Sequence, residues 1–131
     1  MAESAFLWVR GLRFAYPECA VLDNLSLAWP PGLALVRGDE STGKTTLLRV
    51  LAGALTAQAG SITLQGVDLI RAAKASAPRV FWADPRSSEW DPLTARGWLD
   101  SLPARYPLWD AAALMEHIDG FSLHEHLDKP F

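Results

Sequence analysis

The sequence lacks the features that an exported or membrane-embedded protein would carry. Its single cysteine, Cys19, cannot form an internal disulfide, which is typical of a reducing compartment. No stretch approaches the roughly 18 consecutive apolar residues of a membrane span. The N-terminal stretch has acidic Glu3 and an apolar run broken by Arg10, unlike a secretory signal. We therefore expect a cytoplasmic protein whose links to a membrane come through a partner.

An excess of positive charge is also missing. Lysine and arginine total 12 against 15 aspartate and glutamate residues, a formal net charge of −3, and the basic residues form no run. Nucleic-acid binding normally leaves a basic patch or stripe, so we expect no nucleic-acid partner. The chain of 131 residues, half of them hydrophobic, is long enough for one globular domain with a real core.

Residues 38–45, GDESTGKT, fit the phosphate-loop pattern G-x-x-x-x-G-K-[ST]. Such a loop holds a triphosphate with backbone N–H groups at a helix N-terminus, where the helix dipole adds partial positive charge. The pattern lies between an apolar run, LALV, and a stretch of helical periodicity, which is the context that the motif requires. The predicted nucleotide-binding residues of this loop are Gly38, Asp39, Glu40, Ser41, Thr42, Gly43, Lys44, Thr45 and Thr46.

The loop residues have separate predicted roles. Lys44 supplies a mobile charge to the β- and γ-phosphates, and the Thr45 hydroxyl completes the coordination of Mg²⁺. Thr46 hydrogen-bonds the α-phosphate from the start of the helix. Because Asp39 and Glu40 would repel the anion, we expect their side chains to point outward while their N–H groups point in.

Periodicity predicts an α/β chain around this loop. Either one bent or bulged strand or two short strands are expected over residues 5–16, followed by a turn at YPE. The helix that starts at Lys44 should end at Gly53. Further strands are predicted at 25–29, 33–36, 61–65 and 80–82, and further helices near 94–102 and 109–119, where prolines divide the chain into short pieces. Strand 33–36 is a continuous apolar run and should be buried on both faces.

The chain resembles the N-terminal part of an ATP-binding cassette (ABC) domain. The resemblance runs through LRFAYPE, VLDNLSL, GLALVRGDESTGKTTLLRVLAG, GSITLQGVDL, LTARGWLDSL and HLDKPF, in the expected order and spacing. It implies a P-loop NTPase core with a parallel sheet, an N-terminal antiparallel β subdomain and the start of a helical subdomain. The implied divisions are about 1–32 for the β-rich subdomain, 33–84 for the P-loop core and 85–131 for the helical part. The domain is expected to be incomplete.

The resemblance also implies ligands and partners. ATP and Mg²⁺ are the expected cofactors, and Tyr16, in the FAYPE segment, matches the aromatic residue that stacks on adenine in the family. The implied partners are a transmembrane transporter subunit and a second nucleotide-binding domain, so that the complete protein would work as a dimer at the inner face of the membrane. ATP hydrolysis by the complete protein would power transport.

Two departures from the family affect catalysis. Ala83 stands where the family has a glutamine that contacts magnesium, so neighbouring Asp84 is only a tentative metal ligand. The signature turn, the apolar strand ending in Asp-Glu and the later histidine of the family are not in this sequence. We identify no catalytic residue in this chain and expect it to bind ATP without turnover. We also expect it to leave an apolar sheet edge exposed.

Two alternative functions stay open on the sequence alone. VFWAD has the form of a Walker B strand, which would make Asp84 the magnesium carboxylate of a small P-loop phosphotransferase. The chain could also be a truncated, non-hydrolytic nucleotide-binding module.

The sequence contains two further groups of candidate site residues. Because His124 and His126 face different ways on a helix, we interpret them as solvated side chains and not as metal ligands. Trp90 and Trp98 lie where the family meets its transmembrane partner, so they are candidates for that interface.

Overall fold

The computed structural model describes residues 5–72, 80–84 and 86–130. The chain divides into two compact units, and we treat each by itself. The first comprises the described residues up to 72 together with 80–82, and the second begins at Ala83. The predicted β-rich subdomain and the phosphate loop therefore lie in the same unit.

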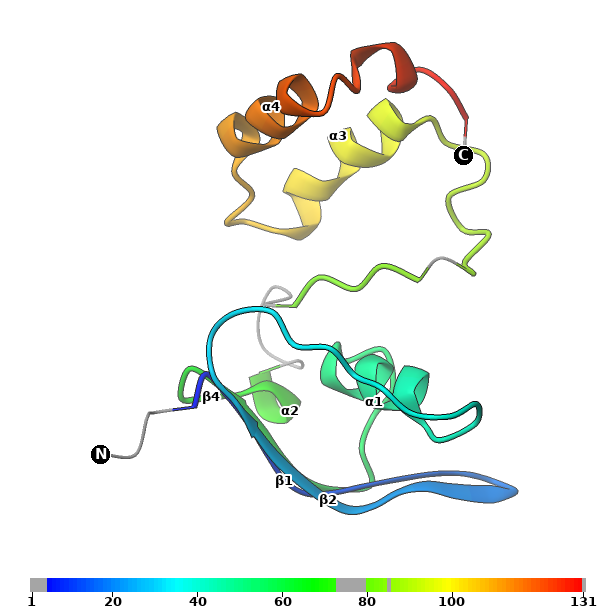
Figure 1. Ribbon diagram of the computed structural model, residues 1–131, viewed down its shortest axis with the longest axis vertical. Helices are drawn as coiled ribbons and strands as arrows, with labels where there is room; N and C mark the ends of the chain where they lie inside the picture. The colour runs from blue at the N-terminus through cyan, green and yellow to red at the C-terminus, as the bar shows by residue number, and fades with distance from the viewer. Residues whose placement is uncertain (1–4, 73–79, 85, 131) are drawn as a thin grey trace. The chain divides into compact units, whose positions relative to one another are not determined.

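The first unit is built on a four-stranded antiparallel sheet with strand order β2-β1-β3-β4 (Figure 1). Its strands are β1 (Leu7–Tyr16), β2 (Cys19–Trp29), β3 (Ala59–Leu64) and β4 (Val67–Asp68). The expected turn at YPE joins β1 to β2, and the register of β1 shifts between Val9 and Leu12, around Gly11. Of the two expected arrangements, the structure has one bulged strand and not two short ones.

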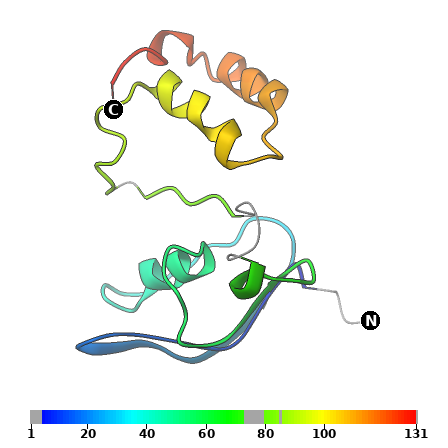
Figure 2. The same cartoon turned by 180° about the vertical axis from the view of Figure 1, so that it is seen from behind.

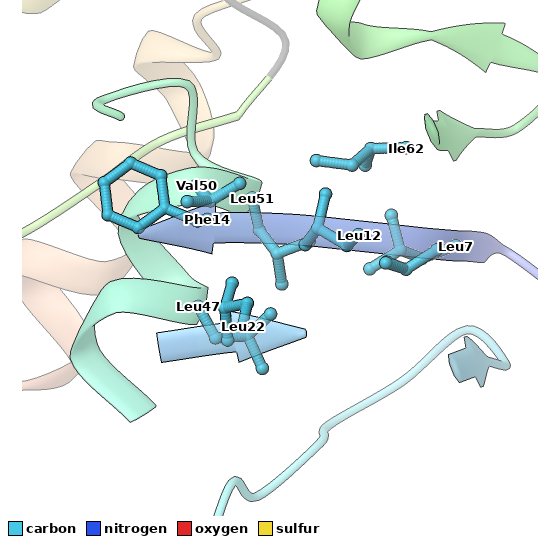
Figure 3. Packing of buried hydrophobic residues seen from close by; sticks show 9 residues of the cluster. Leu7, Leu12, Phe14, Leu22, Leu47, Val50, Leu51 and Ile62 are labelled. Atoms are coloured by element: carbon cyan, nitrogen blue, oxygen red, sulfur yellow. The ribbon is translucent and has the colours of Figure 1, made fainter. Parts of the chain in front are cut away.

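Helices α1 (Lys44–Leu51) and α2 (Leu69–Ala72) cover one face of this sheet, as both views show (Figure 2). Alternation along β1 directs Leu7, Val9, Leu12 and Phe14 towards the helices and leaves Trp8 and Arg10 outside. Figure 3 shows Leu47, Val50 and Leu51 of α1 packed over β1 and β2. The buried cluster consists of Leu7, Val9, Leu12, Phe14, Leu22, Leu47, Val50, Leu51 and Ile62. This packing fixes where α1, and with it the end of the phosphate loop, sits on the sheet.

The predictions of strands at 33–36 and 80–82, and of a parallel sheet, are wrong for the residues described. Residues 33–38 and 80–84 have no regular secondary structure, and all strand pairing between named strands is antiparallel. Leu33 and Leu35 are 103% and 80% exposed, where burial on both faces was expected. A run of this kind becomes a buried strand only when flanking strands satisfy its backbone and cover its side chains. Within the described residues nothing pairs with it, so its apolar side chains face outward.

Helix α1 ends as the sequence predicted. Gly53 has φ of 78° and donates its N–H to Val50 O at 3.1 Å. Ala54 N donates to Arg49 O at 2.9 Å, and the two bonds together form a Schellman motif. The chain then leaves α1 towards β3, which returns it to the sheet beside β1.

The second unit contains α3 (Ala95–Arg105), α4 (Ala111–Gly120) and the 3₁₀ turn η1 (His124–His126). Both helices were predicted within a few residues, and both views show them side by side. Helix α3 continues past Pro103, where the sequence indicated a break, and the proline lies in its last turn. The buried apolar residues of the unit are Leu102, Ile118 and Leu127. None of the helices in the described ranges is long and apolar enough to span a membrane.

Residues 127–130 close over the start of α3. Ala95 N and Arg96 N donate to Lys129 O at 3.3 Å and Leu127 O at 2.8 Å, while the Thr94 hydroxyl accepts from Gly97 N. These contacts satisfy N–H groups of the first turn that an α-helix cannot satisfy internally. The Arg96 guanidinium adds a two-pronged contact with Asp128, with Nε–Oδ1 at 2.7 Å and Nη2–Oδ2 at 3.2 Å.

The Arg96–Asp128 contact makes the protection of this helix end dependent on pH. The hydrogen bond from Arg96 lowers the pKa of the Asp128 carboxyl below its ordinary value of 3.8. The stabilising contribution of the Arg96–Asp128 contact is therefore fully present above pH 3.8, and it is lost as the pH falls through the lower pKa that Asp128 has in the folded state. We expect Asp128→Asn to speed hydrogen exchange at the Ala95 and Arg96 amides at neutral pH, with a difference from wild type that disappears in acid.

The matched control is Asp100→Asn, because Asp100 acts on Arg96 through charge alone. This variant should leave the exchange of both amides nearly unchanged. Equal acceleration by the two variants would contradict the role given to the Asp128 hydrogen bonds.

Candidate functional site

The predicted phosphate loop leads into α1 through a left-handed residue. Gly43 has φ of 92° and ψ of 12° and is the N-cap of the helix, while Ser41 also has positive φ, at 60°. The first helical bond runs from Leu47 N to Gly43 O at 2.8 Å. A left-handed turn that leads into a helix N-terminus is the kind of backbone in which N–H groups form an anion-binding concavity.

The N-terminus of α1 differs from those of α3 and α4. Thr94 caps Gly97 N, and the Asp110 carboxylate accepts from Ala113 N at 2.9 Å. For α1, no side chain in the described part of the chain caps the helix, and no acidic residue stands in its first turn. Its leading N–H groups therefore keep their capacity for an external acceptor, and the helix dipole favours an anionic one.

The Lys44 side chain folds back over the loop. Its Nζ donates to Gly38 O at 2.7 Å and also to Asp39 O, and it lies 3.4 Å from Thr42 Oγ1. The Thr42 hydroxyl donates to Asp39 O at 2.9 Å. The ammonium is thus held by carbonyl oxygens, which are neutral acceptors, at the loop it is predicted to serve. A phosphate oxygen would be a stronger acceptor for the same charge.

Gly43 also packs closely against β2. A Cβ at this position would lie 2.6 Å from Val21 Cγ1, far inside any normal contact. Together with the positive φ, this approach explains why glycine is required here. Sequence reasoning missed Val21, because its contact with the loop depends on how α1 docks on the sheet and leaves no local signal.

In the first unit, Tyr16 lies beside the start of α1. Its hydroxyl lies 3.4 Å from Thr46 Oγ1, and its ring meets Phe14 edge-on, with centroids 5.0 Å apart. Tyr16 is 37% exposed, so part of the ring is open to a ligand, whereas Thr46 is 8% exposed. The aromatic residue predicted for the base therefore lies beside the residue predicted for the α-phosphate.

The remaining predicted loop residues are exposed. Asp39 and Glu40 face solvent, as expected for carboxylates beside an anion site, and so do Ser41 and Thr45. Exposure leaves the Thr45 hydroxyl accessible to a metal ion.

Asp84 and Ala83 belong to the second unit. There the Asp84 carboxylate accepts from Arg86 N at 3.0 Å, in a local turn. Its part in a metal site stays a prediction.

The histidines of the second unit lie beside other polar groups. His124 Nε2 contacts Asp119 Oδ1, and His126 contacts Lys129 Nζ at 2.9 Å and Glu125 at 3.4 Å. Trp90 and Trp98 pack on each other, with ring centroids 5.1 Å apart. Among the described residues, no group of three or more His, Cys, Asp or Glu side chains could hold a metal ion.

Comparison with known proteins gives one consistent result. The sequence model of the ABC transporter family matches residues 22–119. The chain is 47% identical over 62 residues to the sulfate/thiosulfate import ATP-binding protein CysA of Burkholderia mallei. It is 45% identical over 53 residues to the Fe(3+) ions import ATP-binding protein FbpC of Yersinia pestis bv. Antiqua. These matches cover 47% and 40% of this chain but only 18% and 15% of the relatives.

Solved structures show the same fold. An ATP-binding subunit of an ABC transporter superposes with a TM-score of 0.63 at 19% identity, covering 95% of this chain and 54% of that one. A nucleotide-free ATP-binding cassette from an ABC transporter gives a TM-score of 0.58 at 17% identity, covering 96% and 57%. The chain thus spans little more than half of the cassettes that it resembles.

Proposed function

We propose, starting from the fact that this chain belongs to the ABC transporter family, that its phosphate loop binds Mg-ATP. The observation that carries the proposal is the geometry of residues 38–46. There the N-terminus of α1, which no side chain of the described residues caps, lies at the same loop as the Lys44 ammonium. The ammonium contacts Gly38 O, Asp39 O and Thr42 Oγ1, which are polar atoms of that loop. The two relatives named above are ATP-binding proteins, which supports ATP as the nucleotide.

We assign the residues of the loop as follows. The N–H groups of residues 38–46 surround the phosphates, Lys44 contacts the β- and γ-phosphates, and Thr46 contacts the α-phosphate. Thr45 is the proposed Mg²⁺ ligand, because its exposed hydroxyl directly follows Lys44 at the start of α1. A magnesium ion bound there would neutralise charge on the β- and γ-phosphates.

Tyr16 is the proposed platform for adenine. The contact between its hydroxyl and Thr46, at 3.4 Å, supports this role because it sets the ring beside the α-phosphate end of the loop. Adenine and α-phosphate are joined by one ribose, so a base platform must lie near the α-phosphate site. The open part of the ring offers a flat apolar face for stacking.

For the whole protein we propose a role as the nucleotide-binding subunit of a membrane transporter. Its partners would be a transmembrane subunit, with Trp90 and Trp98 in the contact, and a second nucleotide-binding domain. It would then be peripheral to the inner face of the membrane, and hydrolysis in the complete dimer would power transport. The named relatives serve the import of sulfate, thiosulfate and Fe(3+), so a small inorganic ion is the cargo class we propose.

Substitution of Tyr16 tests the base-binding part of the proposal. Tyr16→Ala removes the stacking surface, so we expect Mg-ATP affinity to fall about tenfold, the range measured for loss of one base–aromatic stack. Tyr16→Phe keeps the ring and removes only the hydroxyl contact with Thr46, so its loss should be about twofold. Isothermal titration calorimetry on the full chain measures both.

The matched control is Tyr106→Ala, since Tyr106 lies in the second unit at the end of α3. It should bind Mg-ATP like wild type. A Tyr16→Ala variant that binds as tightly as Tyr106→Ala would show that the base does not stack on Tyr16.

A further inference from the structure

The end of β1 that carries Tyr16 is held by a residue outside the phosphate loop. The pairing of β1 with β3 ends at Arg13 and Ala59, so Ala15 and Tyr16 extend beyond the last rung of that ladder. On this side of β1, the backbone of the two residues has no partner in strand β3. A ligand platform built on such a strand end would be loosely placed unless another group continued the ladder.

Gln58 continues the ladder between β1 and β3 by two hydrogen bonds. Its backbone N–H donates to Arg13 O at 2.9 Å, and its side-chain Nε2 donates to Ala15 O at 3.2 Å. The side chain thus replaces the rung that a longer β3 would supply. Ala15 O belongs to the same planar peptide unit as the backbone nitrogen of Tyr16. A hydrogen bond to this oxygen therefore restrains the orientation of the peptide plane that joins Ala15 to Tyr16.

We propose that Gln58 is a positioning residue for the adenine platform: its side-chain amide, bound to Ala15 O, fixes the backbone of Tyr16 for base stacking. This inference rests on the proposed function of Tyr16 and deepens it. The edge-on contact of Phe14 and the Thr46 hydroxyl restrain the ring itself, whereas Gln58 restrains the strand end. Gln58 touches neither base nor phosphate in this assignment and acts only through Tyr16.

The Gln58→Met variant isolates the side-chain contact. Methionine keeps the length of the side chain and lacks the amide, and the backbone bond to Arg13 O stays in place. The matched control is Gln65→Met, because Gln65 also follows a strand and donates its backbone N–H to a carbonyl just before β1, Phe6 O, at 2.9 Å.

The experiment measures the affinity of the full chain for Mg-ATP and for Mg-tripolyphosphate, which has no base, by calorimetry. We expect Gln58→Met to weaken Mg-ATP binding about three- to tenfold, the effect of losing one hydrogen bond, and to leave tripolyphosphate binding unchanged. Gln65→Met should match wild type for both ligands. In a Tyr16→Ala background, Gln58→Met should cause no further loss, because the two residues act as a unit.

Four results would overturn the inference. They are wild-type affinity of Gln58→Met for Mg-ATP, equal losses for the two ligands, a loss shared by Gln65→Met, or a full further loss in the Tyr16→Ala background. A wild-type chain that binds tripolyphosphate as tightly as ATP would remove the base platform on which the inference rests. A wild-type chain that binds neither ligand would overturn the proposed function itself.

Discussion

Replacing Lys44 by alanine is expected to weaken Mg-ATP binding by about 10- to 100-fold, the loss that follows from one or two charge-assisted hydrogen bonds. The ammonium is held over the loop by Gly38 O and Asp39 O, which are weaker acceptors than a phosphate oxygen. The fold should survive, because these contacts are exposed and lie outside the buried cluster. Calorimetry measures the affinity, and urea unfolding verifies the stability.

Lys129→Ala is the control for the change in charge. Lys129 lies in the second unit, where its ammonium contacts His126 at 2.9 Å, and its removal alters the net charge equally. We expect wild-type affinity for Mg-ATP. If both lysine variants lost affinity to the same degree, binding would depend on overall charge and the phosphate-loop assignment would be wrong.

Replacing Gly43 by alanine is expected to destabilise the first unit by about 2–5 kcal/mol. A left-handed conformation costs a non-glycine residue about 1–2 kcal/mol, and forcing a methyl group against a packed neighbour adds about 1–3 kcal/mol. The Cβ would lie 2.6 Å from Val21 Cγ1, so either the loop or β2 must move. Urea unfolding measures the stability, and Mg-ATP affinity should fall as well, because the displaced turn no longer presents its N–H groups.

The Gly53→Ala variant separates the cost of the left-handed conformation from the cost of the steric contact. Gly53 has φ of 78°, and a Cβ there meets nothing within 4 Å, so this variant should lose only the conformational part, about 1–2 kcal/mol. Combining Gly43→Ala with Val21→Ala removes the clash and should recover part of the stability. Equal losses for the two glycine variants, with no recovery in the double variant, would exclude the contact with Val21 as a cause.

Local patterns were sufficient to predict much of the fold. The bulged strand β1, the start of α1 at Lys44, its end at Gly53 and helices α3 and α4 each depend on signals within a few residues: alternation, a glycine, or helical periodicity. The prediction of a strand at residues 33–36 failed because it depends on distant parts of the chain. The apolar character of residues 33–36 is that of a central strand, but strand formation depends on neighbours that the described residues do not include.

The candidate site was predictable in its loop and not in its supports. The spacing of the residues from Gly38 to Thr46 is sufficient to predict the phosphate loop, because the motif is local. Val21 and Gln58 support the site from other strands and loops, and they reach it only through the docking of α1 and the end of the β1–β3 ladder. Contacts of that kind have no sequence period, so only a three-dimensional structure reveals them.

Amide chemical-shift mapping by NMR on the full chain, with Mg-ATP as the ligand, tests the central claim most directly. The account predicts that the largest changes fall on the amides of residues 38–46 and on Tyr16, and that Mg-tripolyphosphate shifts the loop amides without Tyr16. Changes confined to the second unit, or saturation with ATP that leaves the amides of Gly43 and Lys44 unmoved, would contradict it.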